Sequence, residues 1–175
     1  MRRPIIYSSC LVFLITTSIP WAQQAPPLIA PTEALSPADE MKGFKLPKGY
    51  VVQLVASEPD IFKPMNLSFD YKGRIWITDS LEYPYAAKDG TKPRDSVKIL
   101  SNIGPDGKAQ KIETFAEGLN IPIGLLPLPS KKGAPQTALV HSIPNVYKMQ
   151  DTNNDNKADT KEPFLTGFGF RDTHG

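Results

Sequence analysis

The residues best suited to do chemistry lie in the acidic stretch 151–162, DTNNDNKADTKE. Calcium-binding loops supply oxygen ligands from positions 1, 3, 5, 7, 9 and 12. Counted from the first aspartate, oxygen-bearing groups fall at all of these positions: Asp151, Asn153, Asp155, the backbone carbonyl of Lys157, Asp159 and Glu162. Position 6 is Asn156 rather than glycine, and asparagine is the next most tolerant residue for a left-handed backbone. The spacing favours a hard cation, calcium rather than zinc.

A solvated turn is the second interpretation of the same stretch, because Asn and Asp side chains satisfy nearby backbone groups in such turns. Pro163 follows directly, and the preceding NVYKMQ has the composition of a strand. The loop is therefore expected between strands rather than between the helices of an EF-hand. The sequence leaves both interpretations open.

Period-two patterns indicate that short strands position this loop. The clearest is 65–80, MNLSFDYKGRIWITDS, which predicts a hairpin with a glycine in its turn. Eighteen prolines interrupt most windows in which a long helix could form. Further strands are predicted at 50–57, 96–101, 111–117, 123–128, 137–143 and 145–150.

An internal repeat begins at Val97 and again 49 residues later at Val146. Each copy consists of a strand, a polar turn and a short strand with a phenylalanine; in the first copy only Asn102 and Asp106 keep ligand-type side chains in the turn. Repeats of about 40–50 residues with several strands are typical of propeller blades. The sequence predicts an all-β fold, a partial β-propeller over residues 46–175 with about two to three blades, whereas closed propellers have about 4–8.

The first 22 residues have the features of a secretory signal: Arg2 and Arg3, an apolar run over 4–19, and a cleavage position after Ala22. We expect export to the periplasm or the extracellular space, with an uncleaved, membrane-associated anchor as the alternative. Residues 23–45 are predicted to be a linker containing a short helix that Ser36 caps.

Charge and cysteine content narrow the classes further. The chain carries 20 Lys and Arg against 18 Asp and Glu, so losing Arg2 and Arg3 leaves equal numbers. This balance gives no electrostatic reason to expect nucleic acid as a partner. The one cysteine, Cys10, lies in the signal, so the mature chain cannot form an internal disulfide.

Four segments together resemble a known family: FKLPKGYVVQLVASEP, LSFDYKGRIWITDSLEYP, the acidic loop and LTGFGFRDTHG. Over residues 36–175 they resemble the start of the planctomycete-type membrane-bound dehydrogenases, whose N-terminal propeller is similar to the soluble sugar dehydrogenases that depend on pyrroloquinoline quinone (PQQ). The resemblance implies an oxidoreductase acting on a sugar or other alcohol, with His174 as catalytic base; the alternative for His174 is a loop residue near a blade edge. It also implies PQQ, an electron-transfer partner, and haem c in a C-terminal region missing from these residues.

The alternative from a different class of function is a non-catalytic propeller, stiffened by calcium, that binds a glycan or a protein.

His141 lies in a strand pattern and is expected to be structural. Asp79, Glu82 and Tyr83 follow the strongest strand, where they either line a site or serve as polar loop residues. Arg94 and Asp95 are expected to form a surface pair.

Overall fold

The computed structural model describes residues 33–131 and 133–169. The chain divides into Met1–Ala34 and Leu35–Gly175, and every element described below belongs to the second unit. The predicted signal, the first part of the predicted linker and the candidate base His174 lie outside the described residues. No described helix is long and apolar enough to cross a membrane.

Helix α1, Pro37–Gly43, begins where the sequence predicts. The Ser36 side chain accepts a hydrogen bond from the backbone N–H of Asp39, with an N–O distance of 3.2 Å. Asp39 and Glu40 lie in the first turn, where the helix dipole favours negative charge, and Lys42 lies in the last. None of the helical residues is buried, so capping and charge account for this helix better than packing does.

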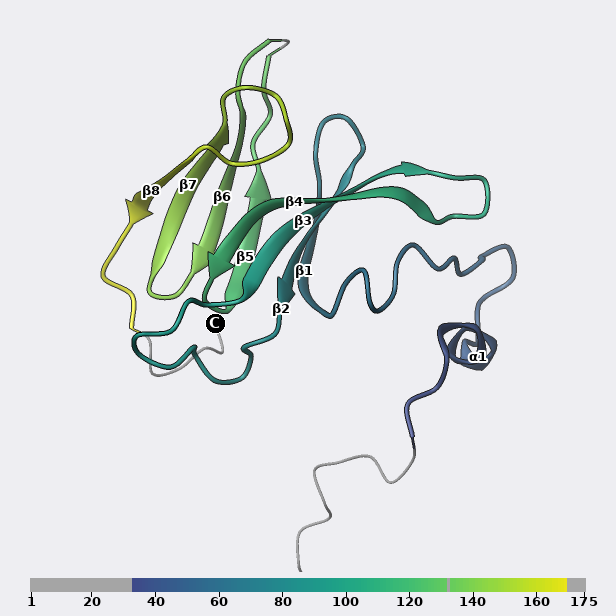
Figure 1. Cartoon of the computed structure of the whole chain (residues 1–175). Helices are drawn as coiled ribbons and strands as arrows, with labels where there is room; N and C mark the ends of the chain where they lie inside the picture. Colours follow the sequence, from purple (N-terminus) through teal and green to yellow (C-terminus); the bar gives the residue numbers. More distant parts are fainter. Residues whose placement is uncertain (1–32, 132, 170–175) are drawn as a thin grey trace, which may run out of the picture. The chain divides into compact units, whose positions relative to one another are not determined.

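Within the described residues, eight strands form two antiparallel sheets with the same strand order (Figure 1). The first sheet has the order β1-β2-β3-β4 and the second β5-β6-β7-β8, and the described residues contain no closed barrel. The all-β prediction is confirmed. The strands are β1 (Lys63–Phe69), β2 (Ile75–Ser80), β3 (Asp95–Ile103), β4 (Ala109–Leu119), β5 (Pro122–Pro127), β6 (Gln136–Ser142), β7 (Asn145–Asp151) and β8 (Thr160–Leu165).

The predicted repeat occupies the third and fourth strands of each sheet. In the first copy Val97 pairs with Ala116 and Lys98 pairs with Thr114. The register therefore shifts by one residue, and Phe115 lies at the shift.

The second copy has the same register. Val146 pairs with Leu165, Tyr147 pairs with Pro163, and Phe164 lies at the shift. Each of these residues stands 49 positions after its counterpart in the first copy. The two hairpins therefore share the same strand pairing, including the one-residue register shift.

The two sheets meet through faces that are not equivalent in the repeat. Ile99 of β3 lies in the core between the sheets, whereas its counterpart Lys148 does not; Met149 of β7 lies in that core, whereas its counterpart Leu100 does not. Successive residues of a strand point to opposite faces. We call the face that carries Ile99 or Lys148 the forward face, and the opposite face the rear face. The forward face of the first sheet packs on the rear face of the second.

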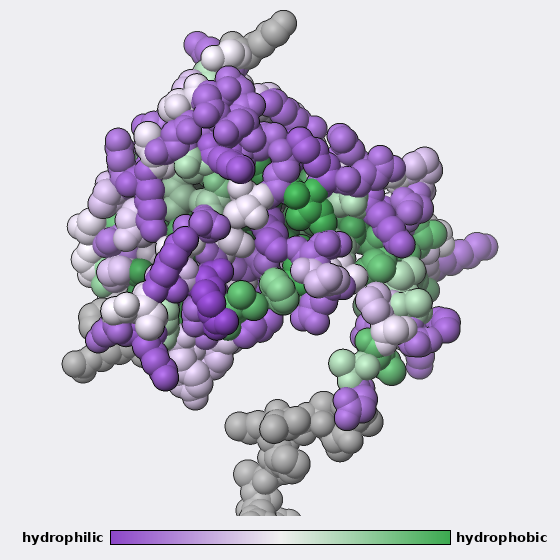
Figure 2. Space-filling model, viewed as in Figure 1, coloured by the Kyte–Doolittle hydropathy of each residue, from purple (hydrophilic) through white to green (hydrophobic). Residues whose placement is uncertain are grey.

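This core between the sheets is apolar. The rings of Trp76 and Phe115 meet edge to face with their centroids 4.6 Å apart, a geometry worth about 0.5–1.5 kcal/mol beyond burial. Hydrophilic side chains cover most of the surface seen in Figure 2, with apolar groups exposed among them. The core cluster comprises Trp76, Val97, Ile99, Phe115, Leu119, Ala138, Val140 and Met149.

The strand predicted at 50–57 is wrong, because the structure has irregular backbone there. This segment and the residues after it hydrogen-bond to the first sheet at separate points. The Ala109 N–H donates to the Val55 carbonyl, and the Phe62 N–H donates to the Asp79 carboxylate. Its β-branched residues suit a partly buried extended chain as well as a strand, so β-propensity alone could not decide between them.

Candidate functional site

The acidic loop is organised around Asp151, the last residue of β7. Its side chain is 1% exposed. One carboxylate oxygen accepts from the N–H groups of Asn154 and Asp155, at 2.7 and 3.3 Å, and the other from that of Asn156, at 2.9 Å. Asp151 therefore folds the loop by satisfying three consecutive backbone donors.

Three further members of the predicted ligand set lie together on the exposed side of the loop. Asn153 Oδ1 accepts from the Asp155 N–H at 3.0 Å, and Asn153 Nδ2 donates to Asp159 at 3.3 Å. Asp159 also accepts from the backbone and hydroxyl of Thr152, and the hydroxyl hydrogen bond lowers its pKa. Asp155 accepts from the Lys157 N–H at 2.8 Å. Two carboxylates and an amide are thus gathered within one turn.

Glu162, the predicted twelfth-position ligand, is not brought to Asp151. It lies in β8 opposite Lys148, on the forward face of the second sheet. Asp151 lies opposite Gln136, on the rear face. Among the residues that the structure describes, no group of three or more His, Cys, Asp or Glu side chains could hold a metal ion. A cation at this loop would therefore depend on Asn153, backbone carbonyls and water beside the two exposed carboxylates.

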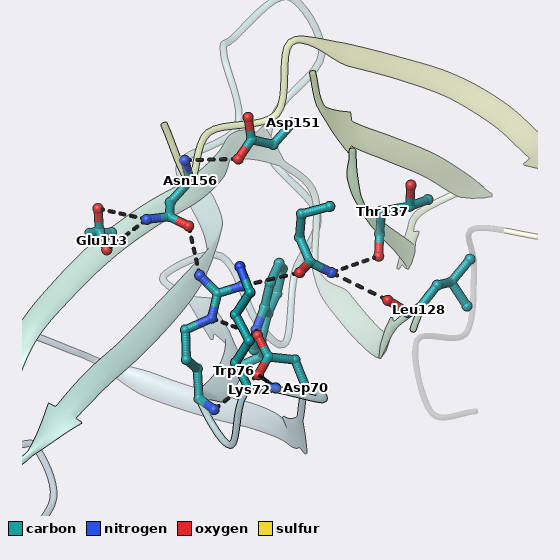
Figure 3. A network of polar contacts seen from close by, with 10 residues as sticks. Asp70, Lys72, Trp76, Glu113, Leu128, Thr137, Asp151 and Asn156 are labelled. Carbon is teal, nitrogen blue, oxygen red and sulfur yellow. Dashed lines mark hydrogen bonds and ion pairs between the residues drawn. The ribbon is translucent and has the colours of Figure 1, made fainter. Parts of the chain in front are cut away.

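The loop also joins the two sheets. The Ala158 N–H donates to the Phe115 carbonyl of β4 at 2.7 Å. Asn156 Nδ2 donates to both carboxylate oxygens of Glu113, also in β4, at 3.2 Å. Figure 3 shows Asn156 between Glu113 and Asp151. Anything that restricts the motion of this loop therefore also restricts the junction between the two sheets.

Arg74, just before β2, reaches the same loop from the first sheet through its hydrogen bond to Asn156. Its guanidinium donates to Asn156 Oδ1 at 2.6 Å and to Gln136 Oε1 at 3.1 Å. Asp70 Oδ2 accepts hydrogen bonds from Arg74 Nε at 2.6 Å and from Trp76 Nε1 at 2.9 Å, and it thereby orients Arg74. A polar network thus runs from the β1–β2 turn into the second sheet.

The charge of Asp70 is well compensated although its side chain is fully buried. Burial opposes ionisation, but hydrogen bonds from Trp76 and Arg74, together with the positive charge of Arg74, outweigh it and lower the pKa of Asp70. The ion pair is therefore charged at neutral pH, and each partner depends on the other.

The predicted role of Asn156 changes in the light of this network. Its φ of 66° is left-handed, as position 6 of a calcium loop requires, and Gly107 occupies the counterpart position with a φ of 84°. Asparagine here supplies a side chain that bridges Arg74 and Glu113, which glycine could not do. The sequence signal was an arginine four residues after an aspartate, but nothing local to it identified Asn156 as its partner.

The end of β2 and the loop after it hold structural ion pairs. Asp79 is buried and lies 2.9 Å from Lys98, and Glu82 lies 2.9 Å from Arg94. The hydrogen bond from Arg94 lowers the pKa of Glu82. The backbone N–H of Tyr83 donates to Ser80. Asp79 is thus a buried residue near the end of β2, and Glu82 and Tyr83 lie in the loop that follows.

The predicted Arg94–Asp95 surface pair is wrong. Asp95 is fully buried at the start of β3, where its carboxylate accepts from the Ser80 hydroxyl and from the Leu81 and Ile121 N–H groups. Asp95 is thus a buried anchor linking the β2–β3 loop to the start of β5. Its burial was invisible in the sequence because it depends on both sheets.

His141 lies in β6 on the forward face of the second sheet, opposite Val146. Its ring centroid is 5.5 Å from that of Phe168, and burial lowers its pKa. These contacts agree with the expected structural role. The other histidine, His174, lies outside the described residues. In the sequence it stands 49 residues after Leu125, which is the offset of the repeat.

A cavity of about 450 Å³ lies beside the acidic loop. Lys161 is at its edge, with the ammonium 4.5 Å from the ring centroid of Tyr147, and burial lowers its pKa. The cavity combines apolar walls with carboxylate and ammonium groups. Its lining comprises Thr114, Phe115, Ala116, Glu117, Met149, Lys157, Ala158, Asp159, Thr160 and Lys161.

Comparison with known proteins gives one match. Residues 36–175 match the family DUF7133, a domain of unknown function, and the chain belongs to this family. No curated protein matches the chain. No solved structure matches it either.

Proposed function

We propose that this DUF7133 member forms two consecutive blades of a β-propeller in an exported protein, and that calcium at the 151–162 loop stiffens the junction between them. The observation that carries the proposal is the bridging position of the loop. Asn156 and Ala158 bind the first sheet, and Asp151 belongs to the second. The shared register and the forward-to-rear stacking support the blade interpretation.

The donor set fits a hard cation in part. Asn153, Asp155 and Asp159 offer exposed oxygens within one turn, and Lys157 offers a backbone carbonyl. Calcium takes about 6–8 oxygen ligands, so water would complete the shell. Asp151 would shape the loop through its backbone hydrogen bonds. A weak affinity is expected, because few carboxylates contribute.

The chain contains a matched control for this site. Asp106 stands 49 residues before Asp155 and accepts from the Lys108 N–H at 3.1 Å, as Asp155 does from Lys157. Asp155→Ala should abolish the calcium-dependent rise in melting temperature, whereas Asp106→Ala should leave it intact. Calcium response that survives Asp155→Ala would exclude this loop.

We carry the dehydrogenase as a second candidate, because the resemblance extends through DTHG at the end of the chain. Bound PQQ would supply the hydride acceptor. His174 would take the proton of a sugar or alcohol hydroxyl, since a histidine pKa lies near neutrality. This role of His174 comes from the resemblance, and Asp79 and Glu82, which were expected to line a site or to be polar loop residues, are held in ion pairs with Lys98 and Arg94.

Reconstitution separates the candidates. The purified protein is mixed with PQQ, calcium, a panel of sugars and an artificial electron acceptor, and acceptor reduction is followed. Sugar-dependent reduction that His174→Ala removes, with quinone binding retained, supports the enzyme. Glycan binding with no reduction supports the non-catalytic propeller. Failure to bind PQQ by the folded protein would end the enzyme proposal.

A further inference from the structure

A second cavity lies on the forward face of the first sheet, where the β1–β2 turn and the β3–β4 hairpin reverse the chain. Its volume is about 470 Å³, within the range of sites that hold small molecules. Residues of the turn, of β3 and of β4 line it, and Asn156 of the acidic loop completes the lining. The cavity therefore belongs to the junction between the two sheets and not to either outer face.

Strand register brings three polar side chains into one row across this cavity. Ser101 of β3 pairs with Lys111 of β4. On the other side, Ile75 of β2 pairs with Leu100, so Arg74 stands next to Ser101. Ser101 lies two residues after a forward-facing core residue of β3, and its neighbours in the row therefore point the same way. A guanidinium, a hydroxyl and an ammonium are thus side by side.

Positive charge exceeds negative charge around the cavity. Arg74 is paired with Asp70 at 2.6 Å, and Lys111 is paired with Glu113 at 2.8 Å. Lys72, also in the lining, forms no ion pair with any residue that the structure describes. Three positive charges against two negative charges leave one in excess, so a ligand with a single negative charge would balance the site.

The same groups have hydrogen-bonding capacity left over. An arginine side chain has five N–H donors, and the network described above uses three of those of Arg74. The side chains of Ser101 and Asn102 have no hydrogen-bond partner within the described part of the chain. A planar guanidinium with two free donors suits the oxygens of an acidic group.

The rest of the lining suits hydroxyl groups. Glu113 can accept hydrogen bonds from hydroxyls, and the amide of Asn102 can both accept and donate. Ile103, at 43% exposed, is the one large apolar side chain among the described residues that line the cavity. A ligand with a large apolar body would find little to contact here, whereas a sugar would find hydrogen-bond partners.

The repeat shows that the fold does not require these charges. The pair Gln150 and Thr160 stands 49 residues after the pair Ser101 and Lys111, with the same register. Neither Gln150 nor Thr160 is charged, yet the hairpin forms. The ammonium of Lys111 is therefore available for binding.

We infer that this cavity binds a sugar that carries one acidic group, a carboxylate or a sulfate, each of which has a single negative charge. The acidic group binds Arg74, Ser101 and Lys111. The sugar hydroxyls bind Asn102 and Glu113. The site needs neither calcium nor quinone, so it goes beyond the proposed function.

Calorimetric titration of the purified protein tests the inference. The probes are glucuronate and glucose sulfated on its primary hydroxyl, with a chelator present so that calcium plays no part. Glucose lacks the acidic group, and acetate and inorganic sulfate lack the sugar. We expect one site for at least one acidic sugar, and the tighter of the two identifies the acidic group. Glucose and the bare anions should bind roughly tenfold more weakly or worse.

Lys111→Gln should weaken the binding of the acidic sugar roughly tenfold, as expected for the loss of one charged hydrogen bond. Lys88→Gln, at an exposed lysine in the β2–β3 loop at the opposite end of the sheet, makes the same change of charge and should bind as the unchanged protein does. Lys72→Gln replaces Lys111→Gln if that variant fails to fold.

Three results would each overturn the inference: no binding of either acidic sugar, equal binding of glucose or of a bare anion, or unchanged affinity in Lys111→Gln. Because calcium is absent from these titrations, none of these results bears on the calcium proposal.

Discussion

The two repeats of this chain have the same hydrogen-bond register and different surroundings. Ile99 pairs with Glu113 as Lys148 pairs with Glu162, yet Phe115 is in the core and Phe164 is half exposed. Hairpin register follows from the turn and the shift, which are local. Burial follows from the next sheet, which is not. The comparison separates what a repeat encodes by itself from what its neighbours add.

The turns of the two repeats make the same point for chemistry. Asp106 and Gly107 in the first turn correspond to Asp155 and Asn156 in the second, and both sixth positions have a left-handed backbone. Only the second turn carries Asp151 at its start and a side chain bridging to the other sheet. The same turn geometry thus only reverses the chain in the first repeat, whereas in the second repeat the turn also joins the two sheets.

The largest effect is expected from paired truncations at the register shift. Phe115→Ala should lower the free energy of unfolding by about 3–5 kcal/mol, because it leaves a cavity beside Trp76. Phe164→Ala should change it on the order of 0.5 kcal/mol in the monomer, as surface substitutions do. Urea denaturation at low protein concentration measures both. Equal losses would show that the two sheets have equivalent surroundings after all.

The next largest loss of stability is expected at the ion pair between Asp70 and Arg74 in the β1–β2 turn, which belongs to the first sheet. Asp70→Asn should cost about 2–3 kcal/mol at neutral pH, because charged hydrogen bonds are lost. The folded pKa of Asp70 is lowered, so its contribution is complete above the ordinary pKa of 3.8 and is lost as pH falls through the folded value. Unfolding measured against pH should show the gap between variant and unchanged protein closing only at acidic pH. A constant gap would mean that Asp70 is not ionised in the folded state.

Much of the fold was predictable because its signals are local. The Ser36 cap, the 65–80 hairpin and each hairpin of the 49-residue repeat depend on residues close in sequence, and the structure bears them out. The errors concern long-range contacts. Asp95 is buried by a loop and a strand of the other sheet, and the 50–57 segment lies against a sheet it does not join.

The candidate site divides in the same way. The spacing of Asn153, Asp155 and Asp159 indicated that their oxygens lie close together, and the structure places them in one turn. The bridging of Asn156 to Arg74 spans 82 residues, so no spacing rule within the loop could find it. Glu162 matched the spacing rule, but strand register, which the rule ignores, directs it to the other face.

A smaller effect is expected at the junction itself. Asn156→Gly keeps the left-handed backbone and removes the side-chain bonds to Arg74 and Glu113. We expect a loss of about 1 kcal/mol, because the lost hydrogen bonds are partly offset by relief of backbone strain. Chemical denaturation measures the loss. A gain in stability would show that the bridge contributes nothing to the junction.

The smallest effect concerns His141, which occupies the forward-face position that Thr78 holds in the first sheet. Burial lowers its folded pKa below 6.5, so the unfolded state binds a proton more readily. Stability should therefore be complete above pH 6.5 and fall slightly as pH drops below it. His141→Gln should flatten that slope, and an NMR titration of the ring should give the lowered pKa. An ordinary pKa there would contradict the burial of the ring.

The most direct test of the account is a calorimetric calcium titration of the unchanged protein, Asp155→Ala and Asp106→Ala. We predict a single bound ion for the unchanged protein and for Asp106→Ala, and none for Asp155→Ala. Folding of each variant is checked by its far-ultraviolet spectrum. No binding to the folded unchanged protein, or equal binding by all three, would contradict the claim that the second turn is a calcium-stiffened junction.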